Sequence, residues 1–243
     1  MAKLFVRATW VGVLSAVLSV TTVWASIDRS IGKTQVETYN GETTEVSVIS
    51  YAFMQELFDQ LANHPRIPFK FPDDGCYARA HKMSLLLEQR GIITIKSFVI
   101  GDLRVETPNH PRGWVEWWYH VAPALYVKDI KPTPQPLAGG PKSSVATTES
   151  VEDMTLMIFD PSIFDDPTSY IDWVGAMVGH RTGRVSESYN TLRFVYTPGD
   201  ISNSEELRDY LIQDLVDMET TLELYKELER ARLEGVTSED YIL

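Results

Sequence analysis

Apolar residues recur at helical spacing in the first third of the chain. Between residues 51 and 63 they fall on one face, which predicts an amphipathic helix. Prolines at 65, 68 and 72 then require an extended approach to Asp73. A second helix is expected to begin at Asp73 or Asp74, where a carboxylate can cap its first turn, and to end at Gly91.

The pattern of several other stretches is typical of strands. Residues 26–50 predict one or two short strands, and residues 92–100, rich in β-branched side chains, predict another that ends at Gly101 and Asp102. Residues 114–127 are apolar on both faces, which predicts a strand buried on both sides that ends or bulges at Pro123. Short strands are also expected at 155–159 and 192–197. Together with the helices they predict an α+β fold.

The pattern changes again near the end of the chain. Residues 131–150 are rich in proline and glycine and predict a surface loop. Ser202 and Glu205 form a capping-box pattern, after which apolar residues at spacings of four and three predict a long acidic helix that ends near Gly235. We expect its apolar seam to pack on its own domain. The alternative is a coiled coil, although the seam covers only about three heptads.

Composition narrows the class of protein. The chain has 243 residues, enough for one compact domain with an appendage, and its 44% hydrophobic and 23% charged residues are typical of globular proteins. The formal net charge is −12. We therefore expect no nucleic-acid partner, because proteins that bind nucleic acids carry basic patches that neutralise phosphates.

The N-terminus has the pattern of an export signal. Lys3 and Arg7 precede an uncharged, largely apolar stretch, and small residues then allow cleavage after Ala25. This predicts a signal peptide at 1–25 and a secreted or periplasmic protein without stable membrane association. The rest of the chain is then expected to divide into a main domain at 26–200 and the acidic helix at 201–243. The alternative is an uncleaved anchor, since no charge occurs between Ala8 and Ile27.

The single cysteine, Cys76, is the first candidate for chemistry. An intrachain disulfide is impossible, and a lone thiol in an oxidising compartment is a liability unless the protein uses it. Cys76 falls at the expected start of the second helix, where free N–H groups and the helix dipole favour a thiolate. Gly75 beside it leaves room for a substrate backbone. The alternative is a buried, inert cysteine.

His120 and Asp160 are candidate partners for this thiol. His120 lies in the buried strand and needs a polar partner there. Asp160 ends a short strand, and Pro161 favours an extended conformation that directs the carboxylate outward, where it could hold the His120 ring. Each has a structural alternative, a core histidine bonded to backbone and a turn-forming aspartate. His81 should point away from Cys76, and surface positions are expected for the remaining histidines, His64, His110 and His180.

The order Cys, His, Asp is that of papain-like and transglutaminase-like folds, in which a helix carries the nucleophile and an antiparallel sheet carries the other two residues. Three blocks resemble bacterial protein-glutaminases: residues 73–83 (DDGCYARAHKM), 118–122 (WYHVA) and 159–164 (FDPSIF). The resemblance covers residues 70–165, and the 131–150 stretch and the C-terminal helix depart from it.

The resemblance implies a transglutaminase-like core and a hydrolase that deamidates protein-bound glutamine. It implies Cys76 as nucleophile, His120 as general acid and base, and Asp160 as the residue that orients His120, with no metal or organic cofactor. The expected partners are proteins or peptides that carry glutamine. Transglutaminase or cysteine peptidase activity on the same fold remains open, as does a non-enzymatic interaction module. The tryptophans of the buried strand are expected in core and rim packing rather than as cleft walls.

Overall fold

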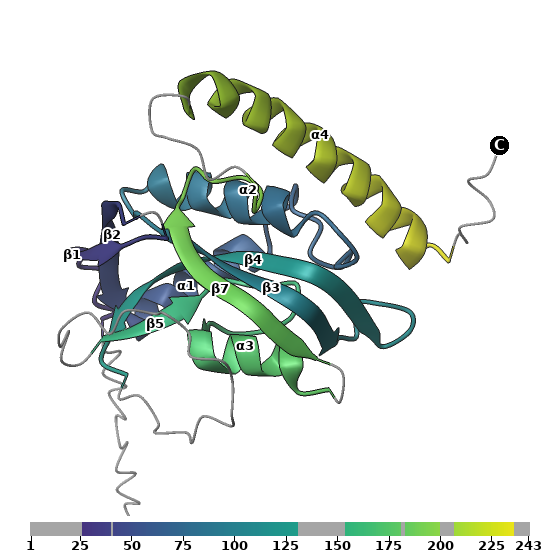
Figure 1. Ribbon diagram of the computed structural model, residues 1–243, viewed down its shortest axis with the longest axis horizontal. Helices are drawn as coiled ribbons and strands as arrows, with labels where there is room; N and C mark the ends of the chain where they lie inside the picture. The colour runs from purple at the N-terminus through teal and green to yellow at the C-terminus, as the bar shows by residue number, and fades with distance from the viewer. Residues whose placement is uncertain (1–25, 40, 131–153, 181–182, 200–206, 236–243) are drawn as a thin grey trace, which may run out of the picture.

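The computed structural model describes residues 26–39, 41–130, 154–180, 183–199 and 207–235. These residues form a mixed α+β fold, as predicted, in which a seven-stranded sheet has helices on both sides (Figure 1). The predicted signal peptide, the 131–150 loop and the Ser202–Glu205 capping box lie outside the described residues. No helix among those described combines the length and the apolar character needed to cross a membrane.

The N-terminal elements are part of the core. Strands β1 (Gly32–Glu37) and β2 (Thr43–Ser50) form an antiparallel pair, and β2 runs parallel to the end of β4. Helix α1 (Tyr51–Ala62) follows at once, because the Ser50 hydroxyl accepts a hydrogen bond from Phe53 N at 3.2 Å and caps its first turn. Its apolar face is buried against the sheet, so the first predicted helix is confirmed.

Helix α2 (Cys76–Glu88) begins two or three residues after its predicted start at Asp73 or Asp74. Its N-cap is Gly75 in a left-handed conformation (φ +78°), and no side chain caps the first turn. The prediction of an aspartate cap was therefore wrong. The Asp74 carboxylate instead accepts a hydrogen bond from Gly75 N at 2.7 Å and another from Tyr225, far along the chain.

The centre of the sheet is antiparallel. Strand β3 (Ile95–Glu106) pairs with β4 (Trp114–Lys128) on one side and with β7 (Arg184–Leu192) on the other. The predicted end at residues 101–102 is instead a bulge, where a Cβ at Gly101 would lie 2.0 Å from Arg184 O, so glycine permits the close approach of β7. Strand β4 also continues through Pro123, which lies opposite Lys96 in β3. The strand predicted at 192–197 lies earlier in the chain, because β7 ends at Leu192.

The elements between β4 and β7 were only partly predicted. Strand β5 (Met154–Ile158) matches its prediction and pairs with β4 and with the short β6 (Thr168–Ser169). Helix α3 (Tyr170–Val178) was not predicted. It begins where the Ser169 hydroxyl accepts a hydrogen bond from Asp172 N, and it buries Trp173 and Met177 beneath the sheet, on the side opposite α2 (Figure 1).

Helix α4 (Leu207–Leu233) lies along the outer side of α2 (Figure 1). Met218 and Leu222 are buried against Ala78, so its apolar seam packs on its own chain as expected. The seam is shorter than the sequence suggests, because Leu215 is 39% exposed.

Candidate active site

Cys76 lies at a cleft of about 660 Å³. The cleft is lined by Cys76 with Asp73 and Asp74 before it, by the β3 bulge at 101–104, and by residues 116–119 of β4. Cys76 is the first residue of α2 and is 4% exposed, so the thiol is accessible only through this cleft. Trp118 is 64% exposed at the rim, in line with the expected rim packing. Both Trp117 and Trp118 also line the cleft, a role that the sequence analysis favoured less.

His120 and Asp160 form a buried pair behind the cleft. His120 Nε2 lies 2.8 Å from Asp160 Oδ2, and both residues are nearly inaccessible to solvent. The indole N–H of Trp173 donates to the same carboxylate oxygen at 2.8 Å, and Ser162 N donates to Oδ1 at 3.3 Å. Every hydrogen-bond partner of Asp160 among the described residues therefore donates, which is the environment of an ionised carboxylate.

The electrostatics of the pair favour its charged form. Burial alone would lower the pKa of His120, but the charge of Asp160 and its hydrogen bond to the ring outweigh burial, Cys76 adds to them, and the pKa is raised to about 9. Burial likewise would raise the pKa of Asp160, but the charge of His120 and the hydrogen bonds from His120 and Trp173 hold it below its usual value. The imidazolium and the carboxylate thus stabilise each other.

The His120 ring is held between aromatic side chains. Trp117 stacks on it with centroids 4.4 Å apart and planes 14° apart, and Trp173 packs at 5.7 Å with a tilt of 38°. The indole N–H of Trp117 also donates to Pro72 O at 2.9 Å. Trp117 therefore ties the orientation of His120 to the segment that leads into Cys76.

Asp160 occupies one ring nitrogen of His120, which leaves Nδ1 for Cys76. Nδ1 is buried and has no hydrogen-bond partner among the described residues, yet Cys76 is close enough to raise the pKa of His120. Contacts between catalytic groups are commonly long without substrate and shorten when it binds. Cys76, His120 and Asp160, which the sequence singled out separately, thus lie at one place.

Tyr119 and Arg79 are parts of the site that sequence reasoning missed. Burial and the charge of Cys76 raise the pKa of Tyr119 far above its usual value, so this hydroxyl at the cleft keeps its proton. Arg79 is buried on α2, and its Nη1 donates to the carbonyls of Phe71 and Asp74 at 3.0 and 2.7 Å. Both residues lie in the quoted blocks, Arg79 in 73–83 and Tyr119 in 118–122, but no local pattern indicates that Arg79 holds the preceding turn.

The other histidines lie outside the pair. His81 is buried beside Lys96, with Nδ1 3.0 Å from its Nζ. The prediction of a surface position for His110 was wrong, because its side chain is 8% exposed and its Nε2 donates to Asp73 at 2.8 Å. His180 is exposed as expected. Across the described ranges, no group of three or more His, Cys, Asp or Glu side chains could hold a metal ion.

Comparison with known proteins gives matches of two kinds. A family model described as "Glutaminase" matches residues 54–136, which include Cys76 and His120. A crystal structure of pro-protein-glutaminase is 27% identical, with a TM-score of 0.55 over 80% of this chain and 64% of that one. The A47Q2 mutant of pro-protein-glutaminase is also 27% identical, with a TM-score of 0.52 over 72% of this chain and 57% of that one. No curated protein matches the chain.

The match by sequence and the matches by structure both point to glutaminases. The chain spans less than two thirds of the length of either pro-protein-glutaminase. The family model nevertheless includes Cys76 and His120, and the family model and the solved structures all carry the name glutaminase. The chain is thus similar to protein-glutaminases in sequence and in structure.

Proposed function

We propose that this protein deamidates glutamine side chains in proteins to glutamate and releases ammonia. The observation that carries the proposal is the buried His120–Asp160 pair, 2.8 Å apart, whose free ring nitrogen is left for the cysteine at a cleft. The roles follow a transglutaminase-like core: Cys76 at the N-terminus of α2 is the nucleophile, His120 the general acid and base, and Asp160 the orienting residue.

In the first half of the reaction, the Cys76 thiolate attacks the carboxamide carbon of a glutamine side chain. The oxyanion is stabilised by backbone N–H groups at the start of α2, including that of Cys76. His120 gives the proton on Nδ1 to the amide nitrogen and the C–N bond breaks. Ammonia is released, and the acyl group remains on Cys76 as a thioester. Tyr119 keeps its hydroxyl proton beside Cys76 and supplies a neutral hydrogen-bond donor there.

In the second half, water attacks the thioester carbonyl while neutral His120 accepts its proton at Nδ1. The C–S bond breaks, glutamate leaves, and the thiolate and imidazolium are restored. Asp160 stays ionised throughout, because three donors surround it, and it fixes the tautomer that leaves Nδ1 for the reacting groups. No metal or organic cofactor enters any step of this scheme.

The direct test is incubation of the purified protein with a glutamine-rich protein. We expect ammonia release, conversion of glutamine to glutamate by peptide mass mapping, and an intact substrate chain. Cross-linked products or amine incorporation at the same glutamines would favour a transglutaminase, and chain cleavage would favour a peptidase. Absence of all three products from folded protein would contradict the proposal.

The pH dependence of the reaction follows from the raised pKa of His120. Its imidazolium is fully present below the ordinary pKa of 6.5 and is lost as pH rises through about 9. We expect kcat/KM for a glutamine peptide to fall on the alkaline side with a midpoint near pH 9, since thioester formation needs this proton. An alkaline midpoint close to 6.5 would show that Asp160 does not hold the proton on the ring.

The proposal extends to location and domain organisation. We propose that residues 1–25 are a signal peptide, that residues 26–200 form the catalytic domain, that 201–243 form an acidic helical appendage, and that the enzyme acts after export, secreted or periplasmic. Its partners are protein or peptide substrates with accessible glutamine, and the net charge of −12 opposes nucleic-acid binding.

A further inference from the structure

One face of α4 is directed at the turn before Cys76. Tyr225, Glu229 and Arg232 lie on this face at spacings of four and three. The Tyr225 hydroxyl donates to Asp74 Oδ2 at 2.7 Å, Glu229 Oε1 accepts from Lys70 N at 2.7 Å, and Arg232 Nη2 lies 2.8 Å from Asp73 Oδ2. Successive turns of α4 thus each bond to residues 70–75, which we call the nucleophile turn.

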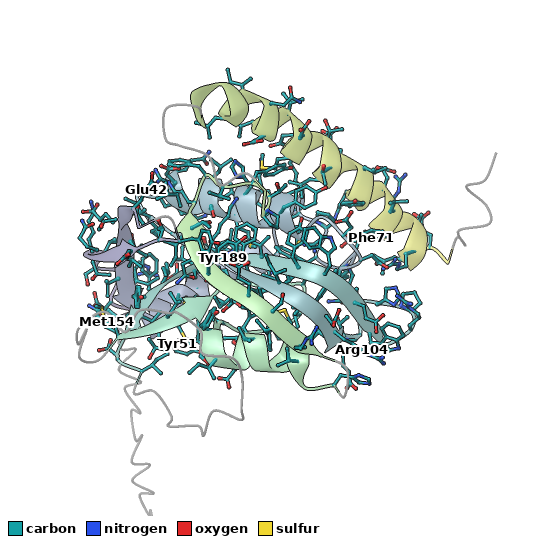
Figure 2. The ribbon with its side chains drawn as sticks, in the orientation of Figure 1. Glu42, Tyr51, Phe71, Arg104, Met154 and Tyr189 are labelled. Atoms are coloured by element: carbon teal, nitrogen blue, oxygen red, sulfur yellow. The ribbon has the colours of Figure 1, made fainter. Side chains whose placement is uncertain are left out.

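These contacts are closely packed. The Tyr225 ring stacks on Phe71 with centroids 5.1 Å apart, and the Arg232 guanidinium lies 4.4 Å from the same ring. Phe71 lies beside the C-terminal half of α4 (Figure 2). A Cβ at Gly75 would come within 2.6 Å of Tyr225 Cδ2, so the ring rests against the residue that precedes the cysteine. Glu229 is 6% exposed, which is unusual for a carboxylate unless its partners are fixed.

The nucleophile turn sets the positions of both reacting groups. Gly75 is the N-cap of α2, so its conformation fixes where Cys76 begins the helix. Pro72 O accepts the hydrogen bond of Trp117, whose ring stacks on His120. A shift of this turn would therefore move the thiol and loosen the ring that faces it. Misplacement of about 1 Å in such a pair can cost on the order of 100-fold in rate.

We propose that α4 is a positioning brace for the active site, with Tyr225, Glu229 and Arg232 as positioning residues. The catalytic part of this inference rests on the proposed function. Among the α4 residues with described side chains, 211–233, none lines the cleft. The brace therefore acts on the alignment of Cys76 and His120, and it reaches the cleft only through its contacts with Asp73 and Asp74. Glu229 instead holds Lys70, which does not line the cleft.

The test compares α4 variants in the full-length protein. We expect Tyr225→Phe, Glu229→Leu and Arg232→Gln each to lower kcat by about tenfold, because alignment is lost. The KM of Glu229→Leu should stay within about twofold, because its partner Lys70 lies outside the cleft lining. Glu229→Gln, which keeps an acceptor for Lys70 N, should remain near the wild-type rate. The matched control is Arg230→Gln, since Arg230 is exposed and pairs with Glu227 in its own helix.

A second readout does not depend on any substrate. The rate at which iodoacetamide alkylates Cys76 should fall by a similar factor in the brace variants and stay unchanged in Arg230→Gln, at a temperature where all variants are folded. Equal kcat and alkylation rates in the Arg232→Gln and Arg230→Gln proteins would overturn the brace. A wild-type protein that releases no ammonia would refute the proposed function, while the alkylation comparison would still decide the role of α4.

Discussion

Replacing Cys76 with serine is expected to abolish ammonia release from protein-bound glutamine, with a loss on the order of 10⁴-fold or more. A thiolate attacks carbonyl carbon readily, whereas a serine hydroxyl remains protonated beside an imidazolium that cannot accept its proton. The raised pKa of His120 makes this loss larger, because the histidine is already charged at neutral pH and is not available as a base for serine.

The measurement is ammonia release at equal concentrations of folded wild-type and variant protein. Cys76 is buried among Ala80, Phe98 and Val121, so the small change from sulfur to oxygen should leave the thermal unfolding temperature near that of the wild type. Cys76→Ala is the matched control, since it removes the nucleophile without adding a hydroxyl. Activity retained in both folded variants would place the chemistry elsewhere.

Asp160→Asn is expected to lower kcat by on the order of 10³- to 10⁴-fold. Every described partner of Asp160 is a donor, so an amide must turn its NH₂ toward another N–H, whichever way it faces. Loss of the carboxylate removes the largest influence that raises the pKa of His120, while burial still lowers it, so we expect this pKa to fall. The ring loses both its orientation and its proton.

The control for this prediction is Trp173→Phe, which removes one donor and keeps the carboxylate and its bond to His120. We expect that variant to lose roughly 10- to 100-fold, the scale of one hydrogen bond to a charged group, and so less than Asp160→Asn. Thermal unfolding and circular dichroism should accompany the rate measurements, because an unsatisfied buried amide also destabilises the fold. An Asp160→Asn protein that is folded and within tenfold of the wild-type kcat would rule out the orienting role of Asp160.

The sequence predicted elements whose signals are local. The 51–63 helix was recognised because its apolar spacing and the residues around it all belong to one short stretch, and Ser50 caps it from the adjacent position. Cys76, His120 and Asp160 were singled out because each lies at an element whose type the local pattern defines. Their convergence followed only from the resemblance to a family with the same order of residues.

The parts that failed depend on distant contacts. Asp74 does not cap α2, because Tyr225, 151 residues away, and Gly75 N take its carboxylate instead. The β3 bulge depends on the approach of β7 to Gly101, which no local pattern reports. Helix α3 is nine residues long, and its buried Trp173 has a polar partner, Asp160, that only the folded chain provides. The contact of Asp160 with Nε2 of His120, rather than with Nδ1, likewise depends on tertiary structure.

The position of α4 in the chain has a consequence for the timing of activity during biosynthesis. It follows every described strand, so a ribosome delivers Cys76, His120 and Asp160 before the helix that bonds to the nucleophile turn. The last of these elements to be synthesised is then the one that aligns the thiol with its histidine. Under the proposed function, a nascent chain would hold the complete set of reacting groups in an unaligned state, and neighbouring proteins would be least exposed to deamidation while synthesis is still under way.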